Sequence, residues 1–138
     1  MSISIFDAYE TDLSAEEGGK WFVDFLGDGT GADIKIRRAS SRAAVKVHQA
    51  VLLENRKHLK KNKFPPEIER LMEAEHTARG LIVDWRGVKD RDGNEIKFDA
   101  DTAKDLLIKL PNFMRDVRAI ANAIDAFRAE GQEEIAGN

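Results

Sequence analysis

A short run of acidic and amide side chains at residues 90–94 has the spacing of the first half of a calcium loop. Its candidate ligands stand at alternate positions: Asp90, Asp92 and Asn94. An EF-hand loop needs glycine at its sixth position and a bidentate glutamate at its twelfth, and Glu95 occupies the sixth position here. The glycine is Gly93, at the fourth position, where a tight hairpin turn needs it. The sequence therefore favours a turn over a calcium site.

Other groups that could do chemistry stand alone. The glycines at 27–31 are not followed by the Lys-Ser/Thr helix start of a phosphate-binding loop, which favours a hairpin loop. Of the three histidines, His48 and His58 have no carboxylate at metal spacing, and His76 has no second imidazole near it in the sequence. There is no cysteine. We therefore predict a protein that is not an enzyme and holds no metal or cofactor.

The charge is unevenly distributed along the chain. Residues 35–63 contain ten Lys or Arg and one acidic residue, whereas the remainder contains 12 basic and 24 acidic residues. The basic cluster from Arg56 to Lys63 has only Phe64 beside it as an aromatic, which is too little for a single-strand stacking platform. We therefore interpret residues 56–63 first as the solvated end of a helix and second as a docking patch for an acidic protein. The alternative function is a nucleic-acid-associated or regulatory module that uses residues 35–63.

Composition points to one domain without a membrane segment. The chain has 138 residues, 42% of them hydrophobic and 34% charged, which suits a single packed core. No apolar run approaches the roughly 20 residues of a membrane helix, and residues 1–7 have no basic region of a secretory signal. We expect one domain over 20–130, an acidic arm over 1–19, a flexible tail over 131–138 and a location in the cytoplasm.

An N-terminal β-hairpin is predicted over 20–38. Residues 20–26 are aromatic and β-branched, and residues 34–38 alternate apolar and basic side chains, as half-buried strands do. A second, smaller hairpin is expected near 87–98, where Val88 would pair with Ile96 and Phe98 across the turn.

Helical periodicity accounts for most of the rest of the chain. Four helices are expected: 41–61, 66–85, 100–110 and 112–129. Ser40 or Ser41 caps the first of them, Pro66 is the first residue of the second, Asp99 or Asp101 caps the third, and Asn112 caps the last. The predicted fold class is α+β and predominantly helical, with the two hairpins beside a bundle of about four helices.

One stretch also carries a family resemblance. The run from Leu81 to Asp90, with the Phe and Leu-Leu-x-x-Leu-Pro positions that follow it, resembles the tail assembly chaperones of long-tailed, siphovirus-type bacteriophages or prophages. The positions that carry the resemblance are Asp84, Trp85, Gly87, Val88, Asp90, Gly93, Phe98, Leu106, Leu107, Leu110 and Pro111. The acidic arm, a Trp-containing strand and Arg-Arg-Ala at 37–39 extend it over most of residues 7–127. The loop 27–33 is longer and richer in glycine than the family pattern.

The resemblance implies binding without chemistry. Such chaperones bind the aggregation-prone tape measure protein before the tail tube forms, recruit tube subunits, and leave as the tube polymerises. It implies a place in the host bacterial cytoplasm and absence from the mature virion, with no membrane or nucleic-acid partner. We expect homo-oligomers, since a small aromatic ribbon does not stand alone. The residues expected to contact a partner or a second copy are Trp21, Phe22, Phe25, Arg37, Arg38, Lys57, Lys60 and Lys61.

Overall fold

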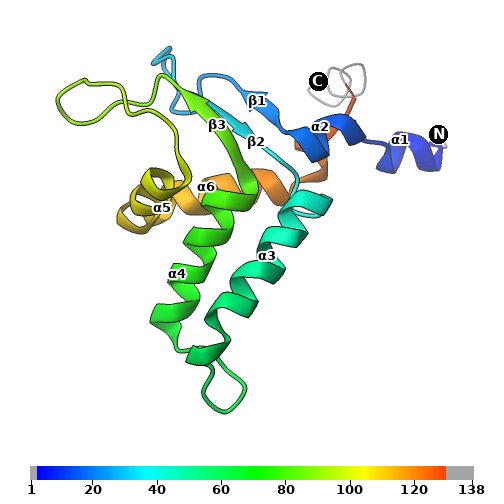
Figure 1. Cartoon of the computed structure of the whole chain (residues 1–138). Helices are drawn as coiled ribbons and strands as arrows, with labels where there is room; N and C mark the ends of the chain where they lie inside the picture. The colour runs from blue at the N-terminus through cyan, green and yellow to red at the C-terminus, as the bar shows by residue number, and fades with distance from the viewer. Residues whose placement is uncertain (1–2, 130–138) are drawn as a thin grey trace.

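The computed structural model describes residues 3–129, and they form an α+β fold in which helices predominate (Figure 1). The sheet is antiparallel, with the strand order β1-β2-β3: β1 (Lys20–Phe22), β2 (Asp33–Ile36) and β3 (Ile82–Arg86). The predicted fold class is confirmed. The N-terminal hairpin forms part of the three-stranded sheet, whereas the hairpin expected near 87–98 is a loop. The tail 131–138 lies outside the described residues.

The N-terminal hairpin forms, but its first strand is shorter than expected. Lys20 pairs with Ile36 and Phe22 with Ile34, in the antiparallel sense. The strand ends at Phe22 rather than at residue 26 because the backbone turns at Asp24, whose φ is +53°. That turn is held by the Asp24 N–H, which donates to the Asp33 carboxylate at 2.8 Å. Local hydrogen bonding of an aspartate therefore outweighs the strand propensity of residues 23–26.

The predicted helix 66–85 is wrong in its second half. Helix α4 (Pro66–His76) passes into a π-helical turn, Thr77–Leu81, and the chain then becomes β3. Ile82, Val83 and Trp85 are β-branched or aromatic and fit a pleated, half-buried surface. Apolar spacing alone does not separate a short buried strand from a helix end. Pairing with β2 decides the outcome, since it gives the backbone of both strands its hydrogen bonds.

Most of the predicted helix starts are confirmed, but the helices end earlier than predicted. Ser41 caps α3 (Arg42–Asn55), Pro66 begins α4, and Asp99 caps α5 (Ala100–Lys109). The first helix ends at Asn55 rather than at 61, and a 3₁₀ turn at Arg56–His58 follows. The last one, α6 (Pro111–Asn122), begins at Pro111, so Asn112 is not its cap. It ends before 129, and a 3₁₀ turn follows at Ile124–Phe127.

The acidic arm is more ordered than its sequence indicated. It contains two short helices, α1 (Ile5–Tyr9) and α2 (Leu13–Gly18), where the sequence analysis predicted only an acidic arm. The loop 87–98, in contrast, is less regular than a hairpin. A single bridge joins Lys89 to Glu95, and the Asp90 carboxylate accepts from the Asp92 and Asn94 amides at 2.9 Å.

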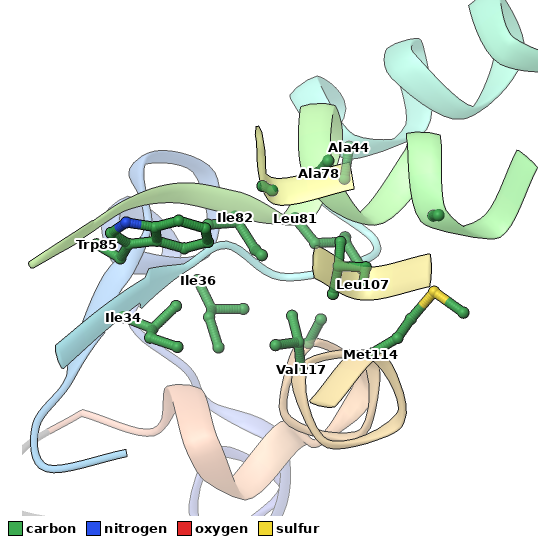
Figure 2. Close-up of a cluster of buried hydrophobic side chains, with 13 residues drawn as sticks. Ile34, Ile36, Ala44, Ala78, Leu81, Ile82, Trp85, Leu107, Met114 and Val117 are labelled. Atoms are coloured by element: carbon green, nitrogen blue, oxygen red, sulfur yellow. The ribbon is translucent and has the colours of Figure 1, made fainter. Parts of the chain in front are cut away.

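The core lies where the sheet meets the helices (Figure 2). Ile34 and Ile36 of the sheet, Leu81 of the π-helical turn, Leu107 of α5 and Val117 of α6 are at most 1% exposed. Trp85 closes the side toward the loop 87–98: its Nε1–H donates to the Ile96 carbonyl at 2.8 Å, and its ring meets Phe98 edge-on. Helices α3 and α4 extend away from this core as a hairpin (Figure 1).

Candidate interaction surface

The α3–α4 hairpin is closely packed at its base. Ala44 of α3 and Ala74 of α4 are fully buried there. A side chain added at Gly80 would place its Cβ 3.2 Å from Val47, so the absence of one lets α3 and the π-helical turn approach each other. Toward the tip this packing is lost. Four leucines are exposed there, by 37 to 64%: Leu52, Leu53, Leu59 and Leu71.

An open groove lies between the two helices below this exposed region. Its volume is about 180 Å³, and its lining is mainly apolar. The side chains that form it are His48, Val51, Leu52, Phe64, Glu69, Met72, Glu73, His76 and Arg118. Pockets that enclose small molecules usually measure about 300–1,000 Å³. The groove is therefore better suited to one or two side chains of another polypeptide than to a small ligand.

A neutral histidine closes the inner end of the groove. The Nε2 of His76 lies 3.3 Å from the Ala44 carbonyl, and its Nδ1 lies 3.3 Å from the Arg118 guanidinium. These partners fit the tautomer in which Nε2–H donates and Nδ1 accepts. Burial lowers the pKa of His76 to about 4, and the positive charge of Arg118 and the nearby His48 act in the same direction.

The structure brings two histidines together that the sequence analysis treated as separate. The His48 and His76 rings meet with centroids 5.0 Å apart, so the expectation that His76 lacks a neighbouring imidazole was wrong. The two histidines are twenty-eight positions apart in the sequence and share no motif, because α3 contributes one and α4 the other. Within residues 3–129 no group of three or more His, Cys, Asp or Glu has metal-binding geometry.

Arg118 contributes a positive charge to the groove. Its guanidinium donates to the Thr77 hydroxyl at 2.9 Å, and across residues 3–129 no carboxylate lies within ion-pair distance of it. Because α6 supplies this residue, three helices meet at the groove. Glu69 and Glu73 of α4 also line the groove, so its lining carries both signs of charge, and an acidic group of an occupant would pair with Arg118.

Two groups of cations in the basic run 35–63 have different surroundings. Arg37 and Arg38 are tied to the arm: Arg37 donates to the Glu17 carbonyl at 2.9 Å, and Arg38 lies 3.3 Å from the Glu16 carboxylate. The other group, which we call the basic tip, is exposed and forms no ion pair in the part of the chain that is described: Arg56, Lys57, Lys60, Lys61 and Lys63. The basic tip borders the groove at Phe64.

The aromatic residues expected at a contact surface lie in the sheet and its turn, apart from the basic tip. The Trp21 ring is half-buried, with the Arg86 guanidinium 4.2 Å from its centroid. Phe22 and Phe25 meet Phe127 and Phe113, respectively, at 5.9 Å. The structure thus separates Trp21, Phe22 and Phe25 from Lys57, Lys60 and Lys61. A role of these rings in binding a partner stays a prediction.

The positions that carry the family resemblance serve the packing around the sheet. Gly87 has φ of +73°, and a Cβ there would lie 2.2 Å from the Gly31 carbonyl oxygen. Asp84 accepts from the Trp85 amide at 2.8 Å, and Val88 packs against the core. In the helix pair, Leu107 is buried, Leu106 is half-buried, Leu110 is 50% exposed and Pro111 begins α6. This motif therefore orders the scaffold from which the α3–α4 hairpin extends.

Sequence reasoning missed the groove and gave the arm too little weight. Met72 and Arg118 come from different elements, and no short motif joins them. A usable signal lay in Val51-Leu52-Leu53, because three successive apolar residues of a helix point in different directions and cannot all face one core. The described residues contain no helix that is long and apolar enough to cross a membrane.

Comparison with known proteins gives one match. A family model described as YdaY prophage protein matches residues 34–138, which include β2 except for its first residue, β3, all of the α3–α4 hairpin and the helix pair α5–α6. No curated protein and no solved structure matches the chain.

Proposed function

Since the chain belongs to the YdaY prophage protein family, we propose that it acts in phage tail assembly as a chaperone that binds the tape measure protein without catalysing a reaction. The resemblance of residues 81–111 to tail assembly chaperones supports this proposal. The observation that carries it is the groove of the α3–α4 hairpin, together with the exposed leucines around it. No cofactor is part of the proposal.

The groove has the features of helix recognition. An amphipathic helix binds by placing its apolar face in a hydrophobic groove, with anchors at positions i, i+3 or i+4 and i+7. Val51, Leu52 and Met72 offer the apolar lining, Arg118 and the neighbouring basic tip offer positive charge, and Glu69 and Glu73 of α4 add negative charge. We infer that the preferred segment of the tape measure protein is an amphipathic helix whose polar face is acidic.

The size of the groove suits a reversible chaperone. Burying one large apolar side chain contributes about 1.5–3 kcal/mol, so one or two anchors leave an affinity that tube subunits can overcome. The charged rim is screened by salt, with a Debye length of about 8 Å at physiological ionic strength. Weak binding of this kind protects the tape measure protein and still releases it as the tube grows. The proposal also includes recruitment of tube subunits.

Co-expression with the tape measure protein of the same prophage tests the proposal. We expect the tape measure protein to become soluble and to copurify with the chain. Leu52→Asp combined with Leu53→Asp should abolish copurification, since Leu52 lines the groove and Leu53, next to it in the chain, is exposed. The matched control is Val23→Asp with Leu26→Asp, which changes two exposed apolar residues of the β1–β2 turn. An insoluble tape measure protein, or equal loss with both pairs, would contradict the proposal.

The basic tip supports a second candidate, a nucleic-acid-binding module. Its five cations are exposed and lie close together in sequence, and contact with Z phosphates makes log K fall with log[salt] at a slope of about −0.9Z. Binding of a duplex or single strand that weakens steeply with salt, and that Lys57→Glu with Lys60→Glu and Lys61→Glu removes, would favour this candidate. The chaperone proposal predicts no such binding.

A further inference from the structure

The N-terminal arm, residues 3–13, carries the most exposed group of large apolar side chains in residues 3–129. Each of the following is 67 to 73% exposed: Ile3, Ile5, Phe6, Tyr9 and Leu13. Helix α1 has only five residues, and none of its side chains is buried. A contiguous apolar patch of this kind on a small protein usually marks an interaction site.

The arm is held in place in this exposed position. Ser4 and Asp7 form a reciprocal capping box at the start of α1. At its end, the Arg128 guanidinium donates to the Asp7 and Ala8 carbonyls, both at 3.0 Å. The Asp12 amide donates to the Phe127 carbonyl at 2.8 Å. These contacts hold the backbone of the arm against the C-terminal 3₁₀ turn, so the apolar side chains are presented to solvent in a defined arrangement.

We propose that the arm of one copy of this chain docks in the α3–α4 groove of a second copy. The charges of the two surfaces are complementary. Residues 3–13 contain three acidic residues and no basic one, whereas residues 56–63 contain five basic residues and no acidic one. An apolar arm that is acidic therefore meets an apolar groove that the basic tip borders, although Glu69 and Glu73 also line that groove.

The side chains match in kind as well as in charge. Ile5 and Tyr9 are four positions apart, so they lie on one face of α1, and Phe6 lies beside them. These are the anchors that a groove lined by Leu52, Phe64 and Met72 accepts.

The contact forms between copies because the arm does not reach the groove of its own chain. In Figure 1, α1 lies at the right edge of the molecule beyond α2, whereas the turn that joins α3 to α4 lies at the bottom. The contacts of Arg128 and Asp12 keep the arm at its end. Two copies placed antiparallel make the contact twice, which gives a closed, isologous dimer.

Self-association and the proposed function are separable. The dimer requires no tape measure protein, so the inference goes beyond the chaperone proposal and survives its failure. If both hold, the arm of the second copy covers the groove until the tape measure protein displaces it. The apolar groove is then not left exposed when no client is present.

Disulfide trapping tests the contact directly, since the natural chain has no cysteine. We expect Phe6→Cys mixed with Leu52→Cys to give a disulfide-linked dimer upon mild oxidation. Phe6 and Leu52 are both exposed, so neither change threatens folding. Val23→Cys mixed with Leu52→Cys is the matched control. Trapping no faster than the control, or a disulfide within one chain when Phe6→Cys and Leu52→Cys are combined, would overturn the proposal.

The dissociation constant of the dimer gives the second test, measured by analytical ultracentrifugation without tape measure protein. Phe6→Asp with Tyr9→Asp should raise it at least tenfold, because two apolar anchors are lost. Lys57→Glu with Lys60→Glu and Lys61→Glu should also raise it, and salt should weaken the natural dimer. Val23→Asp with Leu26→Asp should leave it unchanged. A natural chain that stays monomeric at high concentration, or a dimer that the arm variant leaves intact, would contradict the proposal.

Discussion

The base and the tip of the α3–α4 hairpin are built from the same two helices but differ in what their side chains contact. At the base, Ala44, Ala74, Ala78 and Leu81 are at most 1% exposed. Near the tip, the apolar residues are larger and face solvent, with Leu53 at 64% exposure. The base is joined to the sheet and to α5, whereas only the opposite helix covers the tip (Figure 1).

This difference separates stability from binding within one element. Small residues at the base allow close approach of backbones, and their burial stabilises the fold. Large apolar residues at the tip contribute little to the folded state of a single copy, because they remain in water. They lower the free energy only when another polypeptide covers them. Substitutions at the two ends should therefore separate the two properties.

Removing the largest side chain of the core should have the largest effect. Trp85→Ala deletes a ring that is 4% exposed and should lower the free energy of unfolding by about 3–5 kcal/mol. Trp85→Phe is the milder companion: it keeps a ring but leaves the Ile96 carbonyl without its donor, which costs about 1–3 kcal/mol. Urea denaturation followed by circular dichroism measures both. Equal losses for the two variants would place the importance of Trp85 in its hydrogen bond.

Acid should destabilise the base of the hairpin through His76. Its pKa is about 4 in the folded state, below the ordinary 6.5, so the unfolded chain binds the additional proton between these two pH values. Stability is therefore complete above pH 6.5 and falls as the pH approaches 4, by about 3 kcal/mol from this residue. Urea midpoints at a series of pH values measure the loss. His76→Gln removes this titration and should flatten the profile over that window; an unchanged profile would assign the loss to other groups.

Backbone geometry beside the sheet should come next in size. Gly87→Ala combines a φ of +73° with a Cβ that would meet the Gly31 carbonyl oxygen at 2.2 Å, and we expect a loss of about 2–3 kcal/mol. Gly93→Ala is the matched control, because its φ of +84° is equally unsuitable but no atom lies within 4 Å of the new Cβ. Its expected loss is about 1 kcal/mol. Thermal unfolding of both variants distinguishes the clash from the conformational cost.

Substitutions at the tip should hardly change the free energy of unfolding. Leu53→Ala should change the free energy of unfolding by less than about 0.5 kcal/mol, as surface substitutions usually do. Leu107→Ala, at a fully buried leucine of α5, should lower the free energy of unfolding by about 2–5 kcal/mol. Denaturation of dilute protein is the appropriate measurement, since dimers would add their own stabilisation. A Leu53→Ala loss comparable to that of Leu107→Ala would remove the distinction between the base and the tip.

Local patterns predicted the parts of this fold that local interactions determine. Ser41 and Asp99 cap their helices because a side-chain oxygen accepts a nearby amide, and Pro66 begins a helix because its φ is preset. Strand β3 was missed because its identity depends on β2, which lies more than forty residues away in the sequence. The turn at Gly93 was predicted, whereas the close approach of Gly87 to the Gly31 carbonyl was not.

The candidate site was harder to predict than the fold, for the same physical reason. The basic tip is contiguous in sequence and was therefore visible. The groove is assembled from α3, α4 and α6, and the charge of Arg118 matters only because Thr77 and His76 hold it there. The exposure of Phe6 and Tyr9 likewise follows from the anchoring of α1 by Arg128. Contacts of this kind have no signature in the spacing of residues.

Hydrogen exchange with and without the tape measure protein tests the central claim most directly, which is that the α3–α4 groove binds another polypeptide. The complex is formed from the full chain, and amide protection is followed by mass spectrometry. We predict new protection in residues 48–76, which include eight of the nine residues that line the groove, and little change in β1 or in the loop 87–98. Protection confined to the sheet and the loop, with residues 48–76 unchanged, would contradict the account.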